Sequence, residues 1–145
     1  MSPRLAALQR VHDDAETDER APVDVSEIAV VDHQAIVVAQ PGDPGHATWE
    51  EESWKGRGGA NPWSGLTADP ARGLIFAATG SAAFDFYGGD RKGDNLYANT
   101  VIAIEAKTGR RVWHVQTVRH DLWDYDLPTP PIPVRVKRNG AMVEA

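Results

Sequence analysis

The chain of 145 residues contains no cysteine, which excludes a disulfide framework and any metal site built from thiolates. No apolar run approaches the roughly 18 residues that a membrane-spanning helix needs. No basic segment followed by an apolar core is visible after Met1, so a signal peptide is not expected if Met1 is the natural start. Lys and Arg number 15 against 21 Asp and Glu, without a basic cluster, and we therefore expect no nucleic acid partner.

Turn-forming residues are abundant by contrast. The 13 Gly and 10 Pro favour many short strands over a few long helices. The hydrophobic fraction of 41% and the charged fraction of 25% are ordinary for a globular protein. The composition therefore predicts one domain of ordinary size with many short strands.

Four short apolar segments, separated by turns or by one long polar stretch, predict an antiparallel sheet in up-and-down order. Such a sheet is the unit of a β-propeller blade. The predicted strands are Trp63–Ala68, Leu74–Ala78, Thr100–Glu105 and Arg111–Thr117. A further hairpin of Val134–Lys137 with Met142–Val143 is predicted around Asn139-Gly140, because Asn-Gly is a strong hairpin signal.

The first 39 residues lack this pattern. Residues 1–27 predict a frayed helix that runs into a charged, disordered segment. Ile28–Asp32 and Ala35–Ala39 are two short apolar runs that predict a hairpin.

The segment Ala103–Trp113, with the sequence AIEAKTGRRVW, resembles the tryptophan docking motif of quinoprotein propellers. Its Thr108-Gly109 pair supplies a tight turn with a residue free to take positive φ, and Trp113 can lay its ring against a neighbouring sheet. Glu105 stands where the motif usually has Asp. The alternative is an ordinary hairpin with a core tryptophan.

A second string, Arg57–Trp63 (RGGANPW), resembles the segment of pyrroloquinoline quinone (PQQ) dependent dehydrogenases that enters the central channel beneath the quinone. The resemblance implies that Trp63 stacks on the flat face of PQQ, since a planar quinone suits an aromatic floor. It also implies that Gly58 and Gly59 let backbone approach the cofactor, and that Asn61 belongs to the cofactor site. The alternative is that Trp63 is a core residue at the start of a strand.

A third string, Gln116–Pro128 (QTVRHDLWDYDLP), resembles the most recognisable segment of the same family, which crosses to the channel. The resemblance implies that His120 bonds to substrate or cofactor and that Arg119 adds a fixed positive charge suited to the quinone's carboxylates. The alternative for His120 is a structural histidine bonded to a neighbouring Asp. Three carboxylates are interpreted as caps of backbone N–H groups and not as a metal cluster, namely Asp121, Asp124 and Asp126.

Two more segments bear on metal binding. Ser81 follows Thr79-Gly80 where many relatives carry an Asn that binds calcium, and a hydroxyl is a poorer ligand than an amide carbonyl. Calcium at Ser81 is therefore a weaker expectation than PQQ, and the alternative is a simple turn residue. The loop Asp85–Tyr97 matches the membrane-bound glucose dehydrogenase-like branch and lacks the Glu of an EF-hand. We interpret it as an insertion that crosses the surface and shapes the channel mouth.

The resemblance implies a fold class: all-β, a partial quinoprotein-type β-propeller with one full blade and parts of its neighbours. Residues 40–135 form the blade region, residues 1–39 are unmatched, and residues 136–145 begin a following blade. We interpret the chain as a truncated or split product, and we expect the remaining blades as partners.

The implied function is part of a PQQ-dependent dehydrogenase that oxidises an aldose or an alcohol in the periplasm and passes electrons to a quinone or a cytochrome. In that family a carboxylate base takes the alcohol proton as hydride passes to the quinone, and a cationic residue polarises the quinone carbonyl. We expect both groups downstream of Ala145 and assign no catalytic residue within the chain. Two alternatives stay open: a non-catalytic quinoprotein-like scaffold, against which the retained channel strings argue, and an inactive gene remnant.

Overall fold

The computed structural model describes residues 38–145, and residues 1–37 lie outside the described part. The helix predicted for residues 1–27 therefore lies outside it, as does the hairpin predicted from residues 28–32 and 35–39 apart from its last two residues. The described part begins with two short 3₁₀ turns, η2 (His46–Thr48) and η3 (Glu50–Glu52). No helix among residues 38–145 is long and apolar enough to cross a bilayer.

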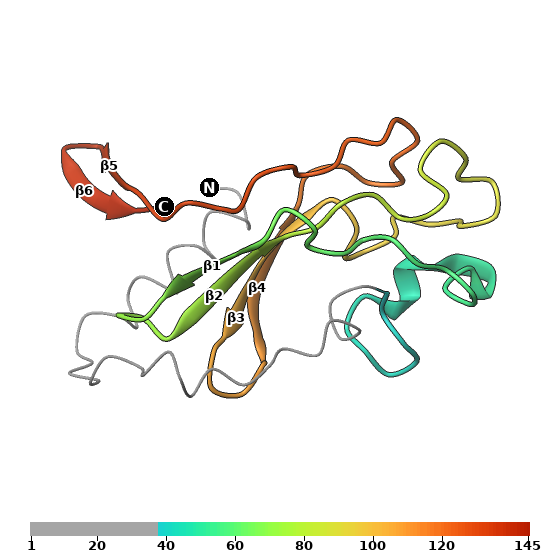
Figure 1. Ribbon diagram of the computed structural model, residues 1–145, viewed down its shortest axis with the longest axis horizontal. Helices are drawn as coiled ribbons and strands as arrows, with labels where there is room; N and C mark the ends of the chain where they lie inside the picture. Colours follow the sequence, from blue (N-terminus) through green and yellow to red (C-terminus); the bar gives the residue numbers. More distant parts are fainter. Residues whose placement is uncertain (1–37) are drawn as a thin grey trace.

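A four-stranded antiparallel sheet is the main element of the fold (Figure 1). Its strands are β1 (Leu66–Asp69), β2 (Leu74–Ala78), β3 (Thr100–Glu105) and β4 (Arg111–Gln116). Each strand pairs with its neighbour in sequence, which confirms the predicted up-and-down order. The first strand begins at Leu66 and not at Trp63, because Pro62 and Gly65 close a turn through a backbone hydrogen bond of 3.2 Å.

One face of the sheet carries the apolar core. Ile75 lies opposite Ile104 in the β2-β3 register, and Ile102 shares their face because side chains alternate along a strand. All three are buried in one cluster with Trp49, whose indole N–H donates to the Leu96 carbonyl at 2.5 Å. The segment before the sheet is thereby fastened over this face.

The opposite face carries the tryptophan of the docking motif. Trp113 is half-buried against Phe76, with ring centroids 5.9 Å apart. The tight turn predicted before it is confirmed: Gly109 has a φ of 72°, and the Thr108 hydroxyl donates to the Glu105 carboxylate at 2.5 Å. Glu105 therefore caps this turn with its own carboxylate.

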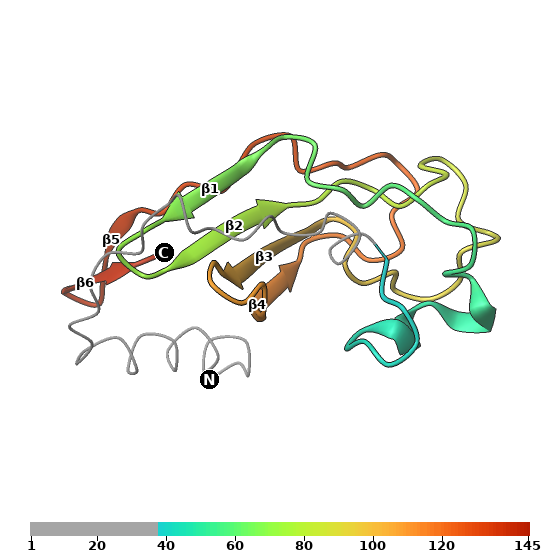
Figure 2. The ribbon, with the colours of Figure 1, turned by 60° about the horizontal axis from the view of Figure 1, so that its bottom comes forward.

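A second, two-stranded sheet pairs β5 (Arg135–Arg138) with β6 (Ala141–Glu144), which confirms the predicted hairpin (Figure 2). Asn139 and Gly140 have φ values of 51° and 87°, as a two-residue hairpin turn requires. The Arg72 side chain forms ion pairs with both Asp69 and Glu144. It thereby ties the hairpin to the β1-β2 turn.

The polar stretch between β2 and β3 is only partly the surface-crossing loop that we expected. Phe84 and Phe86 in its first half and Asp90, Lys92 and Asp94 in its second half are exposed. Between them, Arg91, Asn95 and Tyr97 are buried, and Arg91 is 0% exposed.

Arg91 and Asn95 bond to each other, at 2.9 Å between side chains and 2.7 Å from the Asn95 amide to the Arg91 carbonyl. The stretch is therefore a surface segment that is anchored in the interior by alternate side chains, and its role at a channel mouth stays a prediction.

Candidate functional site

The candidate site lies at the end of the sheet where β2 ends and β3 begins. Here the RGGANPW segment runs antiparallel to the chain that follows β2. The Ala60 N–H donates to the Ser81 carbonyl at 2.7 Å, and the Ala83 N–H donates to the Gly58 carbonyl at 3.1 Å. The fold therefore brings two of the predicted site segments side by side.

The two glycines of this segment have different surroundings. A Cβ at Gly59, where φ is +71°, would lie 2.6 Å from the Ser81 carbonyl oxygen and 2.7 Å from the Ala83 nitrogen. A Cβ at Gly58 would meet no atom within 4 Å. Gly59 is needed for the close approach of the chain to itself. Gly58 instead leaves open space beside the backbone, which suits the approach of a ligand.

Trp63 presents its indole to solvent at the same end. Its side chain is 55% exposed, so Trp63 lies outside the buried core of the described residues, and its stacking role stays a prediction. The indole N–H donates to one carboxylate oxygen of Asp126 at 2.7 Å, and the other oxygen accepts the Ser81 N–H at 2.5 Å. Gly80 makes room for this bridge, because a Cβ there would lie 2.5 Å from the Asp126 carboxylate. Asp126 thus fixes the orientation of an exposed aromatic ring.

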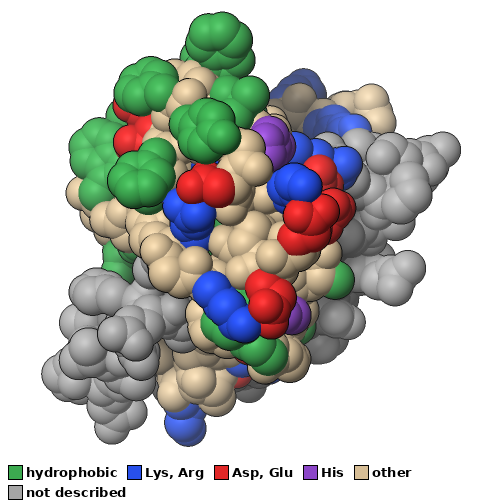
Figure 3. Space-filling view, turned by 90° about the vertical axis from the view of Figure 1, so that its right-hand side faces the viewer, with side chains coloured by type: hydrophobic (Ala, Val, Ile, Leu, Met, Phe, Trp, Pro, Cys, Tyr) green, Lys and Arg blue, Asp and Glu red, His purple; other side chains and the backbone are tan. Residues whose placement is uncertain are grey.

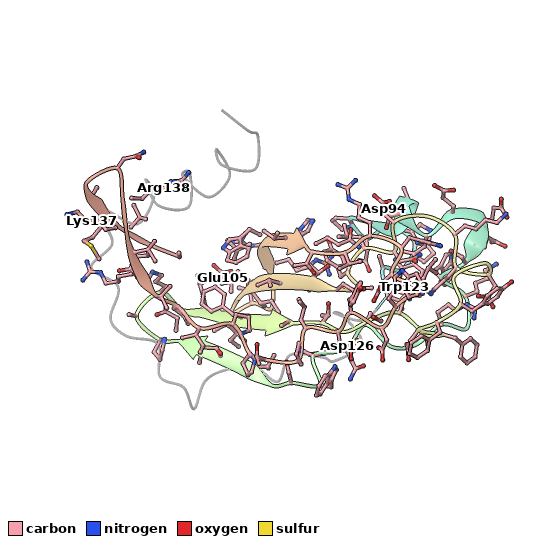
Figure 4. The ribbon with its side chains drawn as sticks, turned by 90° about the horizontal axis from the view of Figure 1, so that it is seen from above. Asp94, Glu105, Trp123, Asp126, Lys137 and Arg138 are labelled. Carbon is pink, nitrogen blue, oxygen red and sulfur yellow. The ribbon has the colours of Figure 1, made fainter. Side chains whose placement is uncertain are left out.

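Exposed aromatic side chains surround the site. Figure 3 shows hydrophobic side chains gathered at this end of the molecule. In Figure 4, Trp123 and Asp126 lie toward this end, away from Lys137 and Arg138. The exposed aromatic residues of the loops here are Phe84, Phe86, Tyr87, Trp123 and Tyr125. Contiguous exposed apolar surface of this kind marks a place where another surface or a ligand binds.

Beneath the exposed residues lies a buried polar cluster. The Ser81 hydroxyl donates to the Asp121 carboxylate, and the Asn99 amide lies 3.1 Å from the Ser81 hydroxyl and 3.0 Å from the same carboxylate. The Asn99 amide also reaches the Tyr125 carbonyl at 2.8 Å. The Asp121 carboxylate accepts the N–H groups of Trp123 and Tyr125 at 3.0 and 2.7 Å. The capping role predicted for Asp121 is therefore confirmed.

These bonds decide the ionisation of Asp121. Burial opposes the charged form, but hydrogen bonds from the Ser81 hydroxyl, from two backbone N–H groups and from Asn99 together outweigh it and lower the pKa of Asp121. Asp124 shows the opposite behaviour. Desolvation and then the charges of Asp126, Asp85 and Asp121 raise its pKa, and no hydrogen bond or ion pair among residues 38–145 engages its side chain. Asp124 is thus a free carboxylate that holds a proton more readily than usual.

His120 and Arg119 are placed by the loop between β2 and β3. The His120 Nδ1 lies 2.9 Å from the Gly93 carbonyl, so in the neutral ring Nδ1 carries the proton and Nε2 is the nitrogen left to accept. Its partner is a carbonyl and not the neighbouring Asp of our alternative. Nε2 faces Gly88, where a Cβ would lie 2.6 Å away. Arg119 is exposed and pairs with Asp94 at 3.4 Å.

The acidic and histidine side chains of residues 38–145 do not gather as ligands around one point. Among residues 38–145, no group of three or more His, Cys, Asp or Glu side chains is arranged to hold an ion. The Ser81 hydroxyl is engaged with Asp121 and Asn99. Calcium binding at Ser81 stays a prediction, and we derive no step through a metal.

Two buried residues of the site were missed by the sequence interpretation, Arg91 and Asn99. Both are 0% exposed, and both bond to the loop that carries Asp124. The position of Asn99 directly before a predicted strand is a signal that could have marked it. The neighbours of Arg91 in the sequence are also polar, so no hydrophobic pattern indicates that Arg91 is buried.

This arrangement belongs to a known family. The β-propeller domain of PQQ glucose, ethanol and alcohol dehydrogenases matches residues 36–145. The chain is a member of this family. The predicted fold, a partial quinoprotein-type β-propeller, is confirmed by this match and by solved structures. A quinohemoprotein alcohol dehydrogenase from Pseudomonas putida HK5 superposes with a TM-score of 0.66 at 27% identity, covering 75% of this chain and 18% of that one.

Relatives with curated names support the assignment to quinoproteins. The chain is 37% identical over 114 residues to the quinoprotein alcohol dehydrogenase PedH of Pseudomonas putida, covering 79% of this chain and 19% of that protein. It is 41% identical over 81 residues to quinoprotein glucose dehydrogenase A of Acinetobacter calcoaceticus, covering 55% and 10%. The quinate/shikimate dehydrogenase (quinone) of Acinetobacter baylyi is 38% identical over 90 residues, covering 61% and 11%. The matched chain spans between a tenth and a fifth of these PQQ dehydrogenases.

Proposed function

We propose that this chain contributes a cofactor-binding blade to a PQQ-dependent dehydrogenase that oxidises an aldose or an alcohol. Electrons would pass to a quinone or a cytochrome, and the remaining blades of the propeller, in the periplasm, would complete the channel. The observation that carries the proposal is the exposed Trp63 indole, fixed by Asp126 beside the free carboxylate of Asp124.

The residues present fit PQQ. Trp63 offers a flat aromatic face, and Asp126 holds its ring plane through the indole N–H. Open backbone at Gly58 leaves room for the edge of a cofactor, with Asn61 exposed on the same segment. When bound, the quinone supplies the oxidising power that amino-acid side chains lack. His120 Nε2 and Arg119 stay proposed contacts to substrate or cofactor.

Asp124 is an exposed carboxylate close to the proposed cofactor face. Desolvation and then the charges of Asp126, Asp85 and Asp121 raise its pKa. We assign it no catalytic role. The carboxylate base and the cationic residue that the reaction needs stay expected downstream of Ala145.

Titrating the full chain with PQQ is expected to quench its tryptophan fluorescence weakly, because a single blade leaves the cofactor unenclosed. Trp63→Phe should remove the quenching, since the fluorescent indole that contacts the cofactor is replaced by a phenyl ring that does not report at this wavelength. Trp123→Phe is the matched control, because Trp123 is also exposed (71%), and it should keep the quenching. Quenching lost only in Trp123→Phe would move the stacking role to Trp123, and no quenching in the unmodified chain would refute independent binding.

Asp126→Asn is expected to lower the pKa of Asp124. Desolvation is the largest cause of the raised pKa and would stay, but the next cause, the Asp126 charge, would be removed. The carboxyl ¹³C shift of Asp124, followed against pH, measures the change. Asp85→Asn is the control and should produce a smaller fall. An unchanged pKa in Asp126→Asn would show that the two carboxylates do not interact.

A further inference from the structure

Arg91 is a buried cation at the base of the site. It is 0% exposed, and none of the ion pairs within residues 38–145 involves it. Its guanidinium donates to uncharged oxygens instead: the Asn95 side chain at 2.9 Å, the Phe84 carbonyl at 3.3 Å, and the Asp121 carbonyl. The charge is therefore buried without a carboxylate in direct contact.

Packing alone does not account for such a residue. Burying a charge without a directly bonded counter-ion is costly, and burial lowers the pKa of Arg91 while the charge of Asp121 opposes this effect most strongly. An apolar side chain would fill the same volume without that cost. What an apolar side chain cannot do is donate to three oxygens from one rigid plane.

The Asp121 carbonyl is the bond through which Arg91 reaches the site. The guanidinium of Arg91 donates a hydrogen bond to the backbone carbonyl of Asp121. The side-chain carboxylate of Asp121 accepts the N–H groups of Trp123 and Tyr125. The turn that presents Asp124 is thus built on a residue whose backbone Arg91 fixes. The Phe84 carbonyl, on the same guanidinium, joins the aromatic loop to this turn.

We propose that Arg91 is a positioning residue, whose fork of N–H groups anchors Asp121 and thereby holds the turn from Asp121 to Asp126. The turn presents Asp124 and the Asp126 carboxylate that orients Trp63. The effect of Arg91 on cofactor binding rests on the proposed function. The anchoring of the turn by Arg91 is independent of the proposed function and can be measured without the cofactor.

Amide hydrogen exchange of the full chain, followed by NMR, tests the anchoring. Arg91→Lys keeps the charge and loses the planar fork, and Arg91→Gln keeps a donor and loses the charge. In Arg91→Lys, exchange at the Trp123 and Tyr125 amides is expected to rise about tenfold, while the β3 amides stay protected. Arg91→Gln should behave in the same way and provides the measurement if the lysine variant does not fold. Arg119→Gln, an exposed arginine of the same region, should change neither set.

Two results would overturn the proposal. Unchanged exchange at Trp123 and Tyr125 would show that the turn holds its shape without Arg91. An equal rise across β2 and β3 would show that Arg91 supports the whole core. In the PQQ titration, Arg91→Lys should weaken quenching about tenfold, in proportion to the loosened turn. If the unmodified chain binds no PQQ, independent binding by this chain is refuted, and the exchange result still decides the role of Arg91.

Discussion

Gly59→Ala is expected to lower the free energy of unfolding by about 3 to 5 kcal/mol. The new Cβ would lie 2.6 Å from the Ser81 carbonyl oxygen and 2.7 Å from the Ala83 nitrogen, and both are backbone atoms that cannot swing aside. The φ of +71° adds to the cost, because alanine in this region is disfavoured by about 1 kcal/mol. Relief requires the RGGANPW segment to part from the chain after β2. Urea denaturation followed by circular dichroism measures the loss.

Gly58→Ala is the matched control for this experiment. It makes the same chemical change one residue earlier, where a Cβ meets no atom within 4 Å. Its stability should stay within about 0.5 kcal/mol of the unmodified chain. Equal stability of the two variants would mean that the segment pairing is not formed in solution. Gly58→Ala would weaken PQQ quenching if the open space beside Gly58 receives the cofactor.

Asp121→Asn is expected to cost about 2 to 4 kcal/mol at neutral pH. In asparagine an NH2 group replaces one of the two carboxylate oxygens, and NH2 cannot accept a hydrogen bond. Whichever oxygen is replaced, at least one of the donors Ser81, Trp123 and Tyr125 loses its acceptor. Asp94→Asn is the control, because Asp94 is exposed and its ion pair with Arg119 should contribute little. A loss no larger than that of Asp94→Asn would contradict the bonding described for Asp121.

The same substitution should change the response to acid. The folded-state pKa of Asp121 is lowered, so its ionised form contributes stability that is fully present above the unfolded value of about 4. That stability is lost as the pH falls from there through the folded pKa. Unfolding measured in urea between neutral and acidic pH should therefore show a smaller acid-induced loss in Asp121→Asn than in the unmodified chain.

The strands could be predicted from sequence because their apolar runs are bounded by local turn signals. β2 and β3 have the predicted bounds, since Gly73 precedes one and the turn ending at Gly109 follows the other. The start of β1 was mispredicted at Trp63. A hydrophobic residue there continues the apolar pattern, but the turn closed by Pro62 and Gly65 displaces it from the sheet.

The contacts of the site could not be predicted, because they join residues far apart in sequence. Trp63 and Asp126 are 63 positions apart, and Arg91 and Asp121 are 30 apart. Resemblance pointed to Trp63 as the ring that stacks on the quinone but not to the carboxylate of Asp126 that orients it. Arg91 stands among polar residues, where no hydrophobic pattern reports burial. The sequence also does not show that Gly59 packs against the backbone of another segment while Gly58 faces open space, because this depends on the folded backbone.

The fastening of the η2-η3 segment has a consequence for the order of folding. β1 pairs with β2 and β3 with β4 across short turns, and such hairpins form on a timescale of about 1–10 μs. Trp49 and Ser53 instead bond to the Leu96 and Lys92 carbonyls, 47 and 39 positions further along the chain. Because closing these long loops costs more chain entropy, we expect the segment to dock after the hairpins have formed. By the same reasoning we expect it to detach before the sheet that it covers.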